Sequence, residues 1–367
     1  MLATKKKFTY TNQIFLGDEE SLFLAPRGIS VAGNRLIVAD TGRNRVFIWH
    51  TYPEAEHQEP DVVLGQADRA GTGRNQGTGA SASSLQYPSG IWSDGERLIV
   101  ADAWNHRVLI WHQFPKTNGQ PADVVLGQKN FTDNQPNLGH ISGSPTAASM
   151  HWPYGVTSDG NHLWVADTGN RRILFYESIP TTSFQEADRV IAQKDFGTKD
   201  YNKEAIIWPY AVKIHTNGRM IVADTACYRM LLWNHWEDAF TQPAAAILGQ
   251  KDMEACGQNQ FGLYPAAHTL NWVYDGLITD QGIFVADAGN SRILWYEQWP
   301  TANSPAADGL IGQEHFGQGG ENRYGLHGTP DTLYWPFAMD IDPIQGALVV
   351  ADTGNHRINK YVLNFES

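Results

Sequence analysis

Residues 163–176 read Leu-Trp-Val-Ala-Asp-Thr-Gly-Asn-Arg-Arg-Ile-Leu-Phe-Tyr, which is an apolar strand ending in Val-Ala-Asp, a four-residue turn, an arginine and a second apolar strand. Val-Ala-Asp occurs six times in the 367-residue chain, with its aspartates 62, 65, 57, 63 and 65 residues apart. Repetition at such a period indicates an architecture built from one repeated unit. The six aspartates, one at the centre of each unit, are Asp40, Asp102, Asp167, Asp224, Asp287 and Asp352.

Each unit predicts four short strands. The first begins at a Pro-x-small segment such as residues 153–155, the next two flank the turn, and the fourth follows a Pro-rich connection, as in residues 61–66. The sixth unit lacks its fourth strand, and a matching segment, residues 13–18, lies near the N-terminus instead. Pairing this strand with the last unit would close a ring and leave no open sheet edge. We therefore expect an all-β fold: a single-domain, six-bladed β-propeller over residues 1–367, with four-stranded antiparallel blades and an N-terminal strand that closes the last blade.

The composition agrees with short strands and turns. Charged residues make up 18% of the chain, and 35 glycines and 18 prolines exclude a helical bundle. The net charge of −12 would repel a nucleic-acid backbone, so a ligand drawn by the overall field should be cationic or neutral.

Location and partners follow from what the sequence lacks. No apolar segment follows the N-terminal lysines, and no run of eighteen apolar residues occurs. The two cysteines, Cys227 and Cys256, predict no disulfide framework and favour a reducing compartment. We expect a soluble, cytoplasmic monomer that binds neither nucleic acid nor membrane. An export signal removed before this sequence is the alternative for its location.

Val350 to Ile358 reads Val-Ala-Asp-Thr-Gly-Asn-His-Arg-Ile, and this unit resembles the NHL repeat. The resemblance covers all six units and nearly the whole chain. It implies the propeller fold but leaves the function open, because propellers of this family serve as protein scaffolds, as RNA readers and, in some cases, as metal-dependent lyases or hydrolases.

Residues that recur in every unit are expected to be structural. An arginine follows each repeat aspartate by five positions, and we expect the two to clamp the turn through a bidentate contact rather than to form a ring of carboxylates around a cation. Two sets of aromatic residues are expected to pack between blades. They are Trp49, Trp111, Tyr176, Trp233, Tyr296 and Tyr361 on the third strands, and Tyr87, Trp152, Trp208, Trp272 and Trp335 before the first strands.

Five long connections lead from a fourth strand to the next unit. They leave the sheets at the same face as the Val-Ala-Asp turns, which we call the top face. Loops longer than about 12–15 residues are uncommon and usually functional, so we expect a lid or wall around the mouth of the central channel. The connections are residues 67–86, 129–151, 194–207, 251–271 and 314–334.

Positions that break the repeat are the candidates for function, because packing explains the positions that obey it. A histidine near a carboxylate and phenols supports acid–base chemistry, so the catalytic candidates are His151, Asp275, Tyr154 and Tyr274. A half-buried imidazole beside Trp152 is the structural alternative for His151. The ligand-binding candidates on the same face are Arg27, Gln86, Trp104, Tyr210, Lys213, Cys227, Tyr228 and Tyr334.

A metal site is the weakest of the predicted features. Scattered histidines and cysteines in the top-face loops could hold zinc or copper, but no short ligand spacing supports this. The residues concerned are His140, His151, His268, His327, Cys227 and Cys256. No cofactor is predicted with certainty.

Two functions remain open. In the first, the chain binds a small-molecule or peptide-like ligand at the top of the channel, and whether it is also an enzyme of the lyase or hydrolase type stays open. Alternatively it is a protein-interaction scaffold without catalysis.

Overall fold

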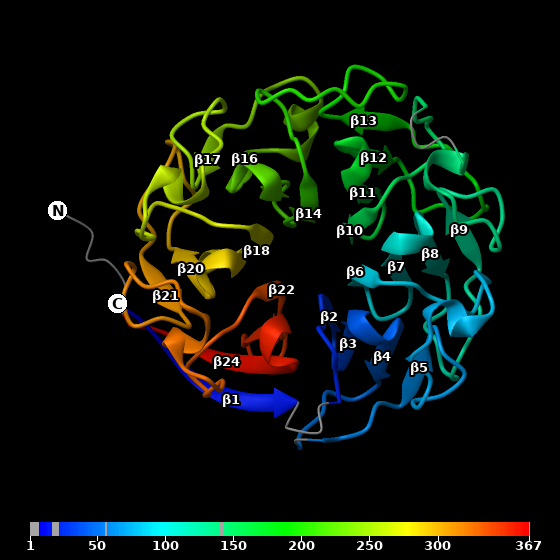
Figure 1. Ribbon diagram of the computed structural model, residues 1–367, viewed down its shortest axis with the longest axis horizontal. Helices are drawn as coiled ribbons and strands as arrows, with labels where there is room; N and C mark the ends of the chain where they lie inside the picture. The colour runs from blue at the N-terminus through cyan, green and yellow to red at the C-terminus, as the bar shows by residue number, and fades with distance from the viewer. Residues whose placement is uncertain (1–6, 17–21, 56, 140–142, 367) are drawn as a thin grey trace.

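The computed structural model describes residues 7–16, 22–55, 57–139 and 143–366. Six four-stranded antiparallel sheets form a ring around a central axis, and in each the first strand lies innermost (Figure 1). The ring confirms the predicted six-bladed β-propeller.

The first three blades follow the chain directly. Their strands, from the axis outwards, are β2 (Gly28–Ala32), β3 (Arg35–Asp40), β4 (Arg45–Trp49) and β5 (Val62–Leu64); β6 (Pro88–Ser93), β7 (Leu98–Asp102), β8 (Arg107–Trp111) and β9 (Val124–Leu126); and β10 (Pro153–Ser158), β11 (Leu163–Asp167), β12 (Arg172–Tyr176) and β13 (Arg189–Ile191).

The last three blades repeat the plan, except that the sixth takes its outer strand from the N-terminus. Their strands are β14 (Pro209–Ile214), β15 (Met220–Asp224), β16 (Arg229–Trp233) and β17 (Ala246–Leu248); β18 (Val273–Thr279), β19 (Gly282–Asp287), β20 (Arg292–Tyr296) and β21 (Gly309–Ile311); and β22 (Pro336–Ile341), β23 (Leu348–Asp352), β24 (Arg357–Glu366) and β1 (Lys7–Leu16).

Strand β1 closes the ring as predicted. It pairs antiparallel with β24, from Lys7 opposite Glu366 to Leu16 opposite Ile358. It therefore begins earlier than the predicted segment 13–18, whose last two residues lie outside the described part of the chain. The Phe8 ring stacks on Trp295 of the fifth blade at 5.1 Å between centroids, so the closing strand is fixed to two blades.

The helical segments are short 3-10 turns. Six of them follow the Val-Ala-Asp strands, and each ends at a residue with left-handed φ. Among the described residues no helix is long and apolar enough to cross a membrane. The six are η1 (Thr41–Arg43), η3 (Ala103–Asn105), η5 (Thr168–Asn170), η6 (Thr225–Cys227), η9 (Ala288–Asn290) and η11 (Thr353–Asn355). The long connections hold η2 (Arg74–Gly77), η4 (Pro136–Gly139), η8 (Gln258–Phe261) and η10 (Glu321–Tyr324), and η7 (Trp236–Phe240) lies between β16 and β17.

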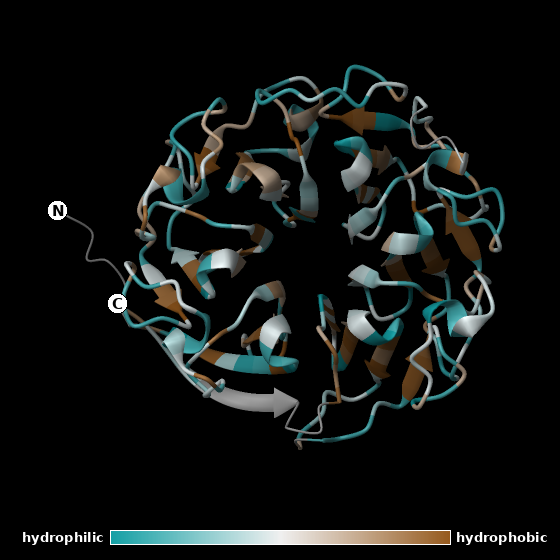
Figure 2. Ribbon diagram, in the orientation of Figure 1, coloured by the Kyte–Doolittle hydropathy of each residue, from teal (hydrophilic) through white to brown (hydrophobic). Residues whose placement is uncertain are grey.

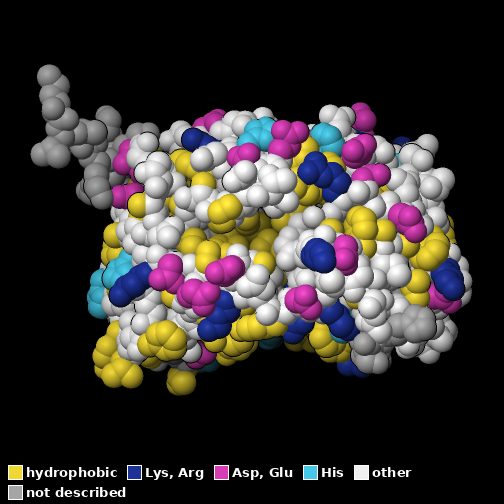
Figure 3. All heavy atoms as spheres, turned by 90° about the horizontal axis from the view of Figure 1, so that it is seen from above, with side chains coloured by type: hydrophobic (Ala, Val, Ile, Leu, Met, Phe, Trp, Pro, Cys, Tyr) yellow, Lys and Arg dark blue, Asp and Glu magenta, His cyan; other side chains and the backbone are white. Residues whose placement is uncertain are grey.

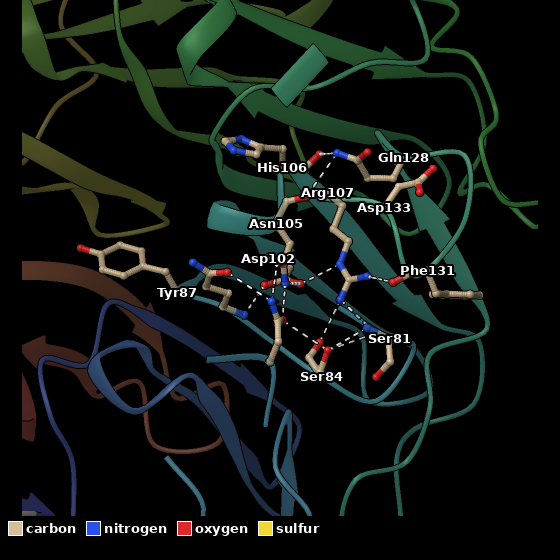
Figure 4. A network of polar contacts seen from close by, with 12 residues as sticks. Ser81, Ser84, Tyr87, Asp102, Asn105, His106, Arg107, Gln128, Phe131 and Asp133 are labelled. Carbon is tan, nitrogen blue, oxygen red and sulfur yellow. Dashed lines mark hydrogen bonds and ion pairs between the residues drawn. The ribbon is translucent and has the colours of Figure 1, made fainter. Parts of the chain in front are cut away.

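The repeated aspartate and arginine form a buried ion pair in every blade, with Nε to Oδ2 distances of 2.7–2.8 Å. Figure 4 shows the second blade, where Asp102 and Arg107 lie at the centre of a polar network. The predicted bidentate contact is wrong, because only Nε donates to the carboxylate. The Arg107 Nη atoms donate instead to the backbone carbonyls of Ser81, Ser84 and Phe131 in the connections before and after the blade.

The second carboxylate oxygen accepts a backbone N–H from the segment that leads into the first strand. In the second blade Gln86 donates to Asp102 at 2.7 Å, and in the third His151 donates to Asp167 at 2.7 Å. The aspartate therefore joins the start of a blade, its turn and its arginine.

Aliphatic residues of neighbouring blades pack together in clusters that each span two blades. Figure 2 shows the apolar strands and the more polar connections. The prediction for the third-strand aromatics is confirmed, because Trp111 and Tyr176 are buried in these clusters. The prediction for the aromatics before the first strands is confirmed in part, because Trp152 contacts His106 of the second blade and Trp208 of the fourth. Trp272 and Trp335 instead remain 43% and 44% exposed on the top face.

We expect Arg172→Met to lower the free energy of unfolding by about 3–5 kcal/mol, because it leaves Asp167 buried without its charge partner. Calorimetric melting measures the loss. The matched control is Arg69→Met, which removes an exposed ion pair with Glu59 and should cost less than about 1 kcal/mol. Equal losses for the two variants would contradict a supporting role for the buried pair.

We expect Phe8→Ala to lower the free energy of unfolding by about 2–3 kcal/mol, because a partly buried ring leaves the seam between the fifth and sixth blades. Thr9→Ala, one residue on in the same strand, is the control. Urea denaturation of both variants measures the difference. An unchanged midpoint for Phe8→Ala would mean that β1 does not hold the ring closed.

Candidate functional site

The top of the channel is closed by a ring of side chains, one from each blade, with Ser89 of the second blade 3.3 Å from the Tyr210 hydroxyl. Tyr154 stacks on Tyr210 at 4.8 Å, Tyr274 meets Tyr210 edge-on at 4.7 Å, and Tyr274 stacks on Phe337 at 3.8 Å between centroids. The Arg27 guanidinium lies over Phe337, 4.2 Å from the ring centroid. The remaining cavity holds about 30 Å³, which is the space of a single water molecule.

Beneath this aromatic ring, the first channel-facing position is small in five blades. A Cβ on Gly28 would lie 1.9 Å from the Ser89 carbonyl oxygen, so the innermost strands approach too closely for a side chain there. The fifth blade places Asp275 at this level, as its register against Ala286 shows. Asp275 is 3% exposed, and its Oδ2 accepts the Met339 N–H at 2.9 Å.

The next channel-facing level carries two more charges. Lys213 Nζ lies 3.7 Å from Asp275 Oδ2, and Asp340 Oδ2 accepts the Val31 N–H at 2.8 Å. Each carboxylate thus joins its own blade to the next one. Burial raises the pKa of Asp275 and of Asp340, and Lys213 opposes the shift in both.

The structure therefore brings together six of the predicted residues, all of which line the channel. The list is Arg27, Tyr154, Tyr210, Lys213, Tyr274 and Asp275. Burial raises the pKa of Tyr154 to about 12, so this phenol stays protonated at neutral pH.

His151 lies apart from this group, in contact with His106 at 5.2 Å and Trp152 at 4.4 Å between ring centroids. Burial lowers the pKa of His151 and lowers that of His106 to about 3. The His106 Nδ1 accepts the Trp152 N–H at 3.1 Å. This arrangement matches the structural alternative given for His151 and does not pair it with Asp275.

The remaining predicted residues lie around the rim. Trp104 stacks on Tyr87 at 4.6 Å, and Tyr228 meets Trp272 edge-on at 5.3 Å. Gln86 and Tyr334 donate their backbone N–H groups to the repeat aspartates, so their positions are set by the backbone.

Cys227 is fully buried and forms a disulfide with Cys256, which contradicts the expectation of unpaired thiols. Four blades have asparagine at the turn position that Cys227 occupies, and this substitution is the sequence signal that the spacing argument missed. Disulfides persist in oxidising compartments, so the cysteines do not favour the cytoplasm, and that location stays a prediction.

The scattered metal ligands are not brought together. Cys227 and Cys256 bind each other, His268 and His327 are exposed, and His140 lies outside the described residues. Within the described ranges, no group of three or more histidine, cysteine, aspartate or glutamate side chains is placed to hold a metal ion.

Sequence reasoning also missed the tips of the long connections. Four connections contain a left-handed turn of three residues with φ between +47° and +92°. Its third residue is Gly77 or Gly139 in the first two and Phe261 or Tyr324 in the last two. The sequence signal for this difference is an aromatic residue in place of glycine two positions after the asparagine that begins each turn.

The two aromatic turns are exposed and apolar. Phe261 and Tyr324 are 83% and 73% exposed, and the leucines two residues later, Leu263 and Leu326, are 93% and 95% exposed. With Tyr264, these residues are called the apolar tips. Hydrophobic side chains project from one corner of the molecule in Figure 3. The two connections touch, because a Cβ on Gly319 would lie 3.1 Å from Pro265.

A pair of asparagines holds each left-handed turn. Asn259 and Asn290 exchange amide hydrogen bonds of 2.9–3.1 Å, and Asn322 and Asn355 exchange bonds of 2.8–2.9 Å. The first member precedes the exposed aromatic by two residues, and the second lies in the turn of the next blade. We call each pair an asparagine latch.

Comparisons with known proteins agree with the repeat. The NHL repeat family matches residues 23–49. NHL repeat-containing protein 2 of Gallus gallus is 34% identical over 93 residues, and that of Bos taurus is 24% identical over 307 residues. The matches cover 25% and 75% of this chain but only 11% and 38% of those proteins, so the chain spans well under half of either.

Two solved structures from Bacteroides thetaiotaomicron share the fold. A protein of unknown function superposes with a TM-score of 0.54, and an auxiliary nutrient binding protein with a TM-score of 0.52, each at 12% identity. They cover 98% and 99% of this chain, and the match takes in 77% and 78% of their own chains. The family match covers the first repeat unit, and the same Val-Ala-Asp turn recurs in all six blades, so the chain is a six-bladed β-propeller that contains an NHL repeat.

Proposed function

We propose that this propeller is a protein-interaction module that docks a partner through the apolar tips on its top face. The observation that carries the proposal is the pair of aromatic residues, Phe261 and Tyr324, at backbone positions where the first two connections have glycine.

The left-handed backbone conformation at Phe261 and Tyr324 is unfavourable, and burial of their side chains does not compensate for it. A side chain in the left-handed region costs roughly 1–2 kcal/mol, and glycine avoids this cost. Each ring packs on a glycine of its own connection, Gly257 or Gly320, but both residues remain more than two-thirds exposed, so packing offsets little of the cost. A local rule broken without structural compensation is the usual sign of a functional residue.

The turns that carry the tips are held in place before any partner arrives. The asparagine latches bind both turns, and the Cys227–Cys256 disulfide fixes the connection that carries Phe261. A preorganised apolar surface loses little conformational entropy on binding, which favours affinity. The partner is therefore a protein that offers a concave apolar surface to two adjacent projections.

A ligand at the top of the channel is the weaker candidate. The aromatic ring leaves about 30 Å³ there, and the predicted catalytic groups are split between the channel and the rim. Lyase or hydrolase chemistry through His151 and Asp275 would need a rearrangement of both. The monomeric state and the exclusion of nucleic acid and membrane stay predictions.

The cost of the left-handed position can be measured at Gly77, where an added Cβ would meet no atom within 4 Å. We expect Gly77→Ala to lower the free energy of unfolding by about 1 kcal/mol through the backbone alone. Phe261→Gly and Tyr324→Gly should leave the melting temperature unchanged or raise it. A clear loss of stability in the latter two would show that the aromatics support the fold.

The docking role is tested by placing a photo-crosslinking phenylalanine analogue at position 263 in the native host. We expect a discrete crosslinked protein, which disappears in the Phe261→Gly/Tyr324→Gly background. The same analogue at Tyr201, an exposed aromatic of another connection, is the control and should give no such product.

Sedimentation velocity and binding to phosphatidylcholine vesicles complete the test. The proposal fails if position 263 gives no adduct or the same adduct as position 201. Crosslinks only to a second copy, or vesicle binding that is lost in the double variant, would overturn it in favour of self-association or a lipid surface.

A further inference from the structure

A second cavity opens at the other end of the channel, on the bottom face, where the first and second strands of each blade are joined by hairpins. It holds about 210 Å³, and all six innermost strands contribute to its wall. The lining residues used below are Ser30, Trp92, Thr157, Lys213, Ile278 and Asp340.

Lys213 and Asp340 are the charged residues that line this cavity, and Asp275 lies above them at the level of the upper cavity. Lys213 is paired with Asp275 across 3.7 Å, which leaves Asp340 as a further carboxylate facing the cavity. The Asp340 oxygens accept the N–H groups of Val31 and Ile341, which hold the carboxylate in place without neutralising it. Asp275 Oδ1 is buried and has no hydrogen-bond partner among the described residues. The cluster therefore carries one net negative charge when all three groups are ionised.

The other lining groups suit a cation that also has an apolar surface. Trp92 offers an aromatic face, which attracts ammonium groups, and Ser30 and Thr157 offer hydroxyl acceptors. The Arg97 guanidinium lies 5.6 Å from the centroid of the Trp92 ring and is bound to Asp94 at 2.6 Å, so its charge is already compensated. The whole chain carries −12, so its field draws cations towards any open cavity.

We propose that the bottom cavity binds a small organic ammonium compound, with its cationic group between Asp340 and Trp92. The volume sets its size. At about 30 Å³ for each water in the liquid, the cavity has the space of roughly seven water molecules. Anions are disfavoured by the charge of the cluster, and larger cations by the volume. The site lies on the opposite face from the apolar tips and does not depend on them.

Isothermal titration of the full chain with tetramethylammonium, choline and ethanolamine tests the proposal. We expect at least one of them to bind, and the neutral carbon isostere of choline and acetate to bind at least about tenfold more weakly, because they lack the cation. Asp340→Asn keeps the shape of the side chain and should remove the preference for choline over its isostere. Glu96→Gln, which removes an exposed charge from the same face, is the matched control and should bind as the parent does.

Asp340 also joins two blades, so Trp92→Leu provides a second variant that leaves this contact in place. We expect a severalfold loss of choline binding with the fold intact by circular dichroism. Failure of all three ammonium probes to bind would overturn the proposal, as would equal binding of the isostere. Loss of binding in Glu96→Gln would also overturn it, because the overall field rather than the cavity would then account for the affinity.

Discussion

A buried carboxylate at the top of every blade, bound to one guanidinium and to the backbone of the segment that enters the blade, is the interaction on which the ring depends. Asp102 shows why: through it and Arg107, the start of the blade, its turn and the connections on both sides share one polar centre. Without these bonds, buried carbonyls of long irregular loops would have no partners, at a cost of roughly 1–3 kcal/mol each. The aspartate–arginine pair therefore supplies hydrogen-bond partners for the buried carbonyls of the long connections.

The ring could be predicted from the sequence because the six repeat units of the chain can be aligned with one another. The six copies of Val-Ala-Asp predict the number of blades. Residues 13–18 predict the closing strand, because they match the fourth strand of the other units. The positions of Trp272 and Cys227 could not be read in the same way. Trp272 follows Asn271, whose N–H donates to Asp287, and this bond cannot be read from the repeat. The partner of Cys227 lies in a connection whose path no periodicity describes.

The candidate sites show the same limit. Asp275 and Lys213 were found because each breaks a strand pattern, and strands set the height of a side chain in the channel. His151 breaks a pattern as well, but its imidazole turns towards His106, a direction that depends on three-dimensional packing. Phe261 and Tyr324 lie outside the strands, in connections that the repeat pattern does not align, and their shared left-handed turn is evident from the backbone angles.

The asparagine latches carry one further consequence. In an open solenoid the terminal repeats unfold first, because each end repeat has a single neighbour. Here Asn75, Asn137, Asn259 and Asn322 each fasten a connection to the blade that follows, and β1 joins the last blade to the chain's beginning. In the closed ring every blade has two neighbours, so no blade can unfold first without breaking the ring. The six blades should therefore unfold in one cooperative transition.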